Sequence, residues 1–177
     1  MGDALQGAPP VVYNGGWYRL NVEAGVAVDV AEFDALVDAG DRLLQLGEAI
    51  SAAETYQAAV ALYRGDLCVG VDIQALVERE RVRARYLSVL AQLADFWFES
   101  GDYGSCLDVV QRLLAADGCR EDAHRLVMRC HVRRGERGQA LRQYRLCESI
   151  LAGEFDAAPE PATLALYERI RLDPDGV

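Results

Sequence analysis

The chain of 177 residues contains no lysine, so all 18 of its basic side chains are arginines. It has only 5 prolines, and its 51% of apolar residues exclude a disordered or collagen-like protein. It lacks the run of roughly 20 apolar residues that a membrane-spanning helix needs, and residues 1–10 lack the basic start and apolar stretch of a signal peptide. These absences predict a soluble, cytoplasmic protein of about one domain's length that does not associate with membranes.

Enzymatic and metal-binding motifs are also missing. There is no nucleophile elbow, phosphate-binding loop or zinc-protease motif, so the sequence predicts no enzyme, no catalytic residues and no cofactor. The five cysteines form no Cys-x-x-Cys pair, and we expect them to be thiols. A metal site is disfavoured because Cys130 and His131 lie about 100° apart on an ideal helix. We expect His124 to be a surface or capping histidine and the cysteines to pack in the core.

Charge is unevenly distributed along the chain. The net charge of −10 argues against a broad surface for nucleic-acid phosphates. Residues 1–78 contain 12 acidic residues and 3 arginines, whereas residues 79–177 contain 16 and 15, which together make the chain's 28 acids and 18 arginines. An anionic partner is therefore expected to bind the second half.

The hydrophobic pattern predicts one hairpin followed by helices. Two β-branched and aromatic runs surround Asn14-Gly15, the strongest short signal for a β-hairpin. From Asp29 onward apolar residues follow a period of 3.6, and Leu164 and Ile170 are expected on the buried face of the last helix. Seven helices are expected, at 29–46, 48–63, 73–100, 103–116, 121–134, 136–151 and 161–172, the third being either one long helix or two abutting ones. This is an all-α architecture with a short N-terminal β-hairpin.

Three glycines mark an internal repeat. Gly101 and Gly135 are 34 residues apart, and Gly47 precedes an equivalent pattern. A small residue follows each glycine by five positions and a large one by nine, at Ala52, Cys106 and Ala140 and at Tyr56, Val110 and Tyr144. Small residues allow helices to approach closely, and the large residue fills the next gap. The period is similar to that of tetratricopeptide (TPR) repeats and predicts a TPR-like superhelix; a non-repeating bundle is the alternative.

Several segments resemble one family in their order and spacing. They are Asp29-Val30-Ala31-Glu32-Phe33, Ala59-Val60-Ala61-Leu62-Tyr63-Arg64-Gly65, Glu121-Asp122-Ala123-His124, Gln139-Ala140-Leu141-Arg142-Gln143-Tyr144 and Leu166-Tyr167-Glu168-Arg169-Ile170. Together they resemble the bacterial transcriptional activator domain of Streptomyces antibiotic regulatory protein-type activators. The resemblance implies a TPR-like regulatory module that dimerises or contacts RNA polymerase or another regulator. The sequence departs from the family after Gly65, where Ala75-Leu76-Val77 replaces the usual tryptophan.

The N-terminal residues resemble part of another domain. In such activators the helical domain follows a winged-helix DNA-binding domain whose wing ends in Gly-Tyr-Arg-Leu, and Gly16-Trp17-Tyr18-Arg19-Leu20 is similar to that ending. Gly2-Asp3-Ala4-Leu5 resembles the residues after the recognition helix. The resemblance implies a winged-helix remnant at 1–25, the TPR-like domain at 26–172 and a tail at 173–177. DNA would then be bound only through an upstream winged helix that this chain does not contain.

A candidate interaction groove follows from charge spacing. Arg125, Arg129 and Arg133 are four residues apart and hence stack on one helix face. The first helix of each TPR pair lines the concave groove, and this resemblance places four acidic residues beside the arginines: Asp34, Asp41, Asp95 and Glu99. Such a face suits an acidic or phosphorylated segment. The alternative is a solvated basic face.

A second run of arginines and an alternative function also follow from the sequence. Arg79, Arg81, Arg83 and Arg85 are spaced by two, which scatters them around a helix, and we interpret them as solvated. The alternative function is a stand-alone TPR adaptor or scaffold that binds an acidic or phosphorylated peptide in its concave groove.

Overall fold

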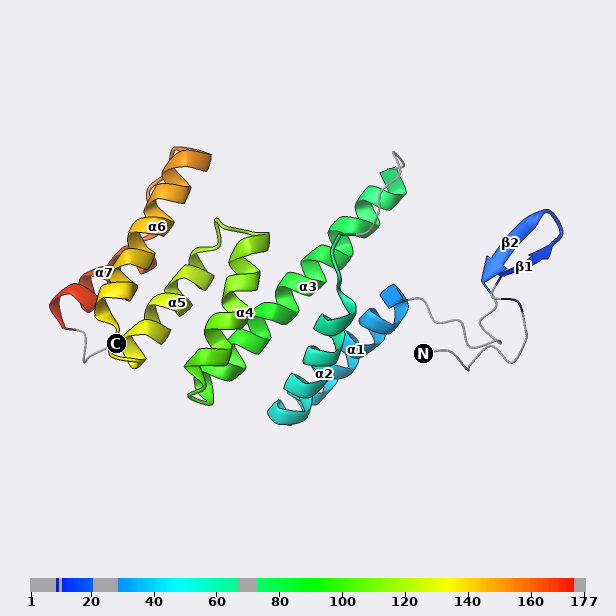
Figure 1. Cartoon of the computed structure of the whole chain (residues 1–177), viewed down its shortest axis with the longest axis horizontal. Coiled ribbons are helices and arrows are strands. Elements are labelled where there is room, and N and C mark those ends of the chain that lie inside the picture. Colours follow the sequence, from blue (N-terminus) through cyan, green and yellow to red (C-terminus); the bar gives the residue numbers. More distant parts are fainter. Residues whose placement is uncertain (1–8, 10, 21–28, 67–72, 174–177) are drawn as a thin grey trace.

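A computed structural model describes residues 9, 11–20, 29–66 and 73–173. These residues form one hairpin and seven helices (Figure 1). Strand β1 (Val11–Asn14) pairs antiparallel with β2 (Trp17–Leu20). The helices are α1 (Asp29–Gln45), α2 (Ala49–Leu62), α3 (Ile73–Glu99), α4 (Tyr103–Ala116), α5 (Glu121–Arg133), α6 (Arg137–Phe155) and α7 (Pro161–Leu172). The predicted hairpin and helices are confirmed, while Gly2 to Leu5 and the end of the tail lie outside the described residues.

Each of three helix pairs turns at a glycine. Gly47, Gly101 and Gly135 have φ angles of 81°, 81° and 75°, in the left-handed region that glycine adopts without a steric cost. At Gly47 and Gly135 the next residue's backbone N–H also bonds a carbonyl five residues back, the Schellman arrangement that ends a helix. The pairs are α1/α2, α3/α4 and α5/α6.

Burial follows the repeat. The small residues after the three turns, Ala52, Cys106 and Ala140, are at most 1% exposed, and the large ones that follow, Tyr56, Val110 and Tyr144, are buried. Figure 1 shows the pairs side by side in an elongated array, with α7 against the last pair. The predicted TPR-like repeat is therefore confirmed.

The structure settles the form of α3 and differs from expectation at α6 and α7. α3 is one continuous helix of 27 residues, which settles the alternative left open by the sequence. α6 continues through Gly153 and ends only where Asp156 adopts a left-handed conformation with φ 51°. In α7, Leu164 is 46% exposed, and Leu166 is buried in its place beside Ile170 and Met128. The buried face of α7 is rotated because this helix packs on both α5 and α6.

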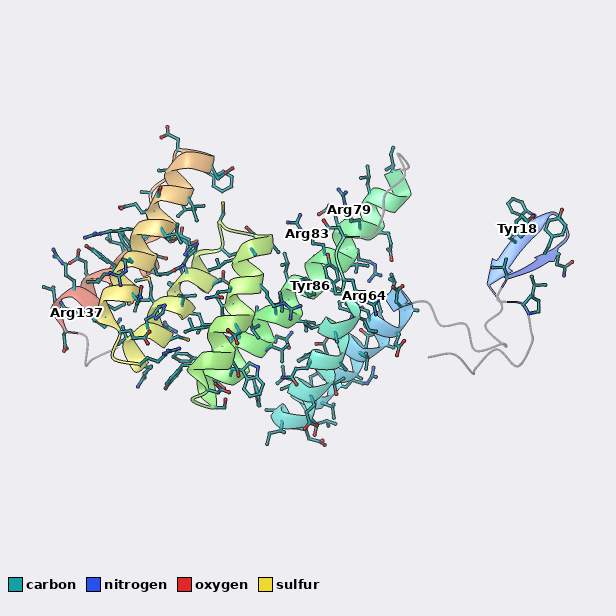
Figure 2. All side chains as sticks on the ribbon, in the orientation of Figure 1. Tyr18, Arg64, Arg79, Arg83, Tyr86 and Arg137 are labelled. Carbon is teal, nitrogen blue, oxygen red and sulfur yellow. The ribbon has the colours of Figure 1, made fainter. Side chains whose placement is uncertain are left out.

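The arginines at the start of α3 are not simply solvated. Arg81 donates two hydrogen bonds to Asp34 of α1, of 3.0 and 2.7 Å, and Arg85 donates another of 2.9 Å. Arg83 donates to the carbonyl oxygen of Ala116 at 2.6 Å and so caps the end of α4. Figure 2 shows Arg79 and Arg83 along this part of α3. The interpretation of the run as solvated is therefore wrong for Arg81, Arg83 and Arg85. The spacing of two turns these side chains to different sides of α3, where α1 and α4 supply their partners.

The far end of the array is held in a similar way. Arg137, labelled in Figure 2, donates through Nε to the carbonyl oxygen of Ile170 at 3.0 Å and also donates to the carbonyl oxygen of Arg171, so it caps α7 from the start of α6.

Among the described helices, none combines the length and the apolar character that a membrane span requires.

Candidate functional site

Two adjoining pockets lie along α5 and share Arg125 and Arg129. One, of about 270 Å³, is lined by α3, α4 and α5: Ala91, Ala94, Asp95, Leu113, Asp122, Ala123, Arg125, Leu126 and Arg129. The other, of about 390 Å³, is lined by α3, α5 and α7: Phe98, Arg125, Arg129, Arg133, Ala162, Ala165, Leu166 and Arg169. We call the second the arginine pocket and the two together the arginine groove.

The amphipathic pattern of α5 positions the arginines. Its buried side carries His124, Val127 and Cys130, so residues spaced by four on the opposite side face outward. Arg125 is fixed by α7, because its Nη1 donates to Thr163 Oγ1 at 2.8 Å and to Glu160 Oε2 at 3.1 Å. Its role is partly structural.

The other cations of the groove have no hydrogen-bond or ion-pair partner among the described residues. The side chains of Arg129, Arg133 and Arg169 are exposed and make no hydrogen bond or ion pair with the residues that the structure describes. Arg169 comes from α7, and sequence reasoning did not include it in the groove. Three guanidinium groups are therefore available to carboxylates or phosphates at one place.

The acidic side chains that line the groove are Asp95 of α3 and Asp122 of α5. Asp95 lines the smaller pocket with Arg129. Partial removal from water raises the pKa of Asp95, and the carboxylates of Glu99 and Asp122 raise it further, whereas Arg129 acts in the opposite direction. The structure therefore brings Asp95 close to Arg129, whereas Glu99 is near Asp95 but lines neither pocket.

The two carboxylates of α1 that were predicted for the groove, Asp34 and Asp41, form hydrogen bonds within the fold. Asp34 accepts hydrogen bonds from Arg81 and Arg85, and the Arg81 bond is the main cause of its lowered pKa. Asp41 Oδ1 lies 2.6 Å from the hydroxyl of Tyr56, which donates to it. Neither residue lines the arginine groove, and nor does Glu99, so we place the candidate site at Asp95, Arg125, Arg129 and Arg133, extended by Arg169.

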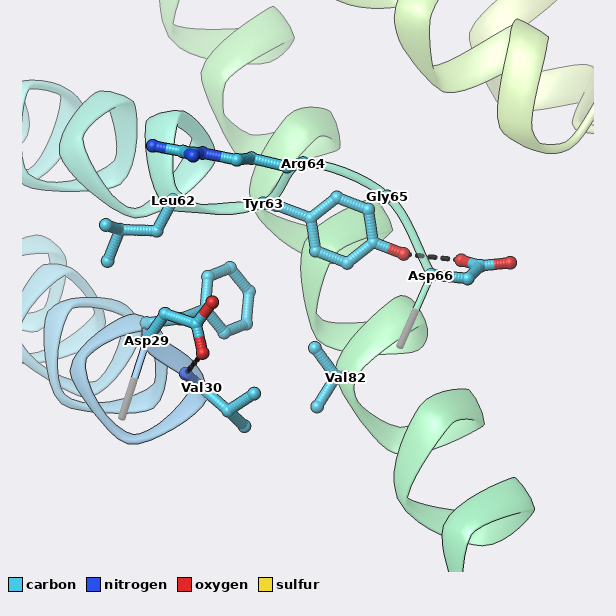
Figure 3. A pocket seen from close by; sticks show the side chains of 9 residues that line it. Asp29, Val30, Leu62, Tyr63, Arg64, Gly65, Asp66 and Val82 are labelled. Atoms are coloured by element: carbon cyan, nitrogen blue, oxygen red, sulfur yellow. Dashed lines mark hydrogen bonds between the residues drawn. The ribbon is translucent and has the colours of Figure 1, made fainter. Parts of the chain in front are cut away.

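A separate pocket of about 250 Å³ lies at the start of the array (Figure 3). Its walls include Val30, Leu62 and Val82, and Tyr63 donates to Asp66 at 2.6 Å along its edge. Burial raises the pKa of Tyr63, which keeps its hydroxyl protonated. Its charged residues are Asp29, Asp66 and a single arginine, Arg64, so this pocket does not offer the cluster of cations found in the groove.

No set of three His, Cys, Asp or Glu side chains within the described ranges is arranged to hold a metal ion. His124, expected at the surface or as a cap, is 1% exposed and bonds the carbonyl oxygen of Gly118 at 2.9 Å. The Sγ atoms of Cys106 and Cys130 lie 3.3 Å apart where α4 meets α5. Both are free cysteines rather than a disulfide, and the neighbouring thiol and burial raise the pKa of Cys106.

Comparison with protein families gives a match across the helical array. The model of the family described as bacterial transcriptional activator domain matches residues 28–171. Regulatory protein AfsR of Streptomyces coelicolor is 27% identical over 166 residues, which cover 93% of this chain. The chain spans only 17% of the length of that relative.

Solved structures share the fold. Mycobacterium tuberculosis EmbR, solved in complex with a low-affinity phosphopeptide, superposes with a TM-score of 0.63 and 20% identity, over 94% of this chain and 45% of that one. The C-terminal TPR-containing domain of a putative Plasmodium falciparum FK506-binding protein superposes with a TM-score of 0.59 and 16% identity. The match covers 84% of this chain and 91% of that one. PcrH, solved in complex with the chaperone-binding region of PopB, superposes with a TM-score of 0.51 and 18% identity. The match covers 83% of this chain and 96% of that one. These likenesses confirm the predicted TPR-like fold.

Proposed function

This chain belongs to the bacterial transcriptional activator domain family, and we propose that its arginine groove contacts another protein during transcription activation. The family and the fold make it the helical regulatory module of a transcriptional activator. The proposed contact either brings activators together or reaches RNA polymerase or another regulator. The observation that carries the proposal is the cluster of Arg129 and Arg133 on α5 with Arg169 on α7, none of which makes a hydrogen bond or ion pair within the described part of the chain.

The charge of the groove indicates the chemistry of the partner. Arg129, Arg133 and Arg169 lie together in a chain whose net charge is −10, and unlike Arg81 and Arg85 they make no hydrogen bond or ion pair with a carboxylate of the described residues, although Asp95 is near enough to Arg129 to interact with its charge. Guanidinium groups form their strongest hydrogen bonds with carboxylates and phosphates. An acidic protein segment is the partner that this surface favours.

We also propose that residues 1–25 are the end of a winged-helix domain. The hairpin exposes Tyr13, Trp17 and Tyr18 by 63%, 77% and 78%, and Figure 2 shows Tyr18 on it. A two-stranded hairpin is at best marginally stable in water alone, so this hairpin needs a larger sheet to cover its aromatic side chains. In this proposal DNA is bound only through that upstream domain.

A reporter assay tests the proposed function. The whole chain is fused to an unrelated DNA-binding domain, and transcription is measured from a promoter that carries its site. We expect more transcription than with the DNA-binding domain alone, and the double variant Arg129→Ala/Arg133→Ala should reduce this gain. Arg125 is left intact because it holds α7.

The matched control changes two arginines elsewhere. Arg142 and Arg145 are exposed on α6 and do not line the groove, so Arg142→Ala/Arg145→Ala should activate like the wild type. Equal loss in both double variants would rule out a specific role of the groove. No activation by the wild-type fusion, with normal amounts of folded protein, would refute the activator function.

The alternative function is a stand-alone adaptor. The same arginine groove supports it, because a cationic TPR-like surface suits an acidic or phosphorylated peptide without any link to transcription. A silent reporter, together with binding of a purified acidic peptide that Arg129→Ala/Arg133→Ala weakens, would favour the adaptor.

A further inference from the structure

The arginine pocket combines an apolar floor with a cationic rim. Phe98 and Leu166 contribute large apolar side chains, and Ala162 and Ala165 leave space beside them. Arg129, Arg133 and Arg169 stand at the rim, and none of the lining residues is acidic. The best occupant of such a pocket is a bulky apolar side chain with carboxylates on either side.

The chain itself carries a side chain of this description. Phe155, the last residue of α6, is 65% exposed, and Glu154 and Asp156 flank it in the sequence. Neither carboxylate forms an ion pair within the described residues. Of the large apolar side chains exposed in the described part of the chain, Phe155 is the one with an acidic residue on both sides. We call Glu154, Phe155 and Asp156 the acidic knob.

The acidic knob is presented away from its own helix pair. Figure 1 shows the last turns of α6 rising beyond α5, and the left-handed Asp156 then turns the chain back toward α7. Phe155 does not line the arginine pocket of its own chain. The acidic knob of one molecule is therefore free to reach the arginine pocket of another.

We propose that the acidic knob of one copy of this chain binds the arginine pocket of a second copy. This inference rests on the proposed function, because it specifies self-association as the contact that the groove makes. Phe155 contacts the floor formed by Phe98 and Leu166, while Glu154 and Asp156 pair with the rim arginines. The two surfaces differ, so the contact is heterologous and arranges copies head to tail.

Sedimentation velocity over a range of concentrations tests the self-association. Wild-type chain should form dimers and larger species as concentration rises, and added salt should weaken them because the rim pairs are exposed. Phe155→Ala should raise the dissociation constant by about tenfold or more, as loss of a central anchor does. Leu172→Ala is the matched control, since Leu172 is 74% exposed at the end of α7 and does not line the pocket.

A mixing experiment tests the pairing of knob and pocket. Phe155→Ala keeps its pocket and Arg129→Ala/Arg133→Ala keeps its knob, so each alone should be monomeric while a mixture forms a one-to-one dimer. Circular dichroism establishes that both variants retain the helical content of the wild type. Association of Phe155→Ala equal to that of the wild type, or a mixture that stays monomeric, would overturn the inference.

The outcomes separate this inference from the proposed function. A monomeric wild type whose fusion still activates the reporter through the groove refutes only the self-association. A silent reporter with knob-dependent dimers refutes the activator function and leaves the contact itself established.

Discussion

A Cβ atom added at Gly40 of α1 would lie only 2.4 Å from Cε1 of Tyr56 in α2. The ring of Tyr56 is fixed against this glycine, because its hydroxyl donates to Asp41 and also lies 2.5 Å from Oε1 of Gln92 on α3. Tyr56 is 2% exposed and has no room to withdraw. The closest approach of the first helix pair therefore depends on the missing side chain of Gly40.

Gly40→Ala should destabilise the chain. The clash with Tyr56 should cost about 1–3 kcal/mol, against a gain in helix propensity of about 1 kcal/mol. The control is Gly153→Ala in α6, where an added Cβ meets no atom within 4 Å and where we expect a gain of about 0.5–1 kcal/mol. Urea unfolding followed by circular dichroism measures both, and a stabilised Gly40→Ala would show that α1 and α2 can separate freely.

His124→Ala should cost about 2–4 kcal/mol of unfolding free energy. Because a carbonyl only accepts, His124 Nε2 carries the proton that binds the Gly118 oxygen, and Nδ1 accepts from the Gln143 amide at 2.7 Å. The substitution leaves both partners without their bonds inside the fold. His131→Ala, whose ring pairs with Glu136 near the surface, should cost less than about 1 kcal/mol. Similar losses in the two variants would contradict a structural role specific to His124.

The ion pair between α1 and α3 should make stability depend on pH in acid. The hydrogen bond from Arg81 holds the pKa of Asp34 below its ordinary value of 3.8, and the charge of Arg85 lowers it further. A carboxylate whose pKa is lower in the folded state stabilises the fold above the unfolded value, and this contribution is lost as pH falls through the folded pKa.

Asp34→Asn should therefore lower the unfolding free energy by about 1 kcal/mol at about pH 7, and the difference from the wild type should shrink below about pH 3. Glu32→Gln, an exposed change on the same helix without an ion pair in the described residues, should show little effect at either pH. A constant difference for Asp34→Asn at all pH values would show that its charge is not the cause.

Local signals explain how much of the fold was predictable from sequence. The helices follow from apolar periodicity, and the turns follow from Gly47, Gly101 and Gly135, whose left-handed conformations other residues avoid. The end of α6 was placed too early, at residue 151, because the helix continues through Gly153: a glycine with ordinary backbone angles weakens a helix but does not end it. Which side of α7 is buried depends on its contacts with α5 and α6. The apolar periodicity of α7 alone carries no information about those contacts.

The candidate site was predictable in part: the TPR resemblance placed Asp95 of α3 beside the arginines of α5, and it lines a pocket with Arg129. A spacing of four places Arg125, Arg129 and Arg133 on one face of α5 without any tertiary information. Phe98 and Arg169 join them from α3 and α7, and no sequence pattern relates residues so far apart. For the same reason, the sequence did not show that Arg81 binds Asp34, which is 47 residues away.

Because successive helix pairs contact mainly their neighbours along the array, parts of the fold can open without the whole chain unfolding. The middle pair, α3 and α4, is covered on both sides, whereas the first pair and α7 each have a neighbour on one side only among the described helices. Amide hydrogens of α3 and α4 should accordingly exchange with solvent deuterium most slowly. The two ends of the array should open locally before the middle pair does. One of these ends, α7, forms a wall of the arginine pocket.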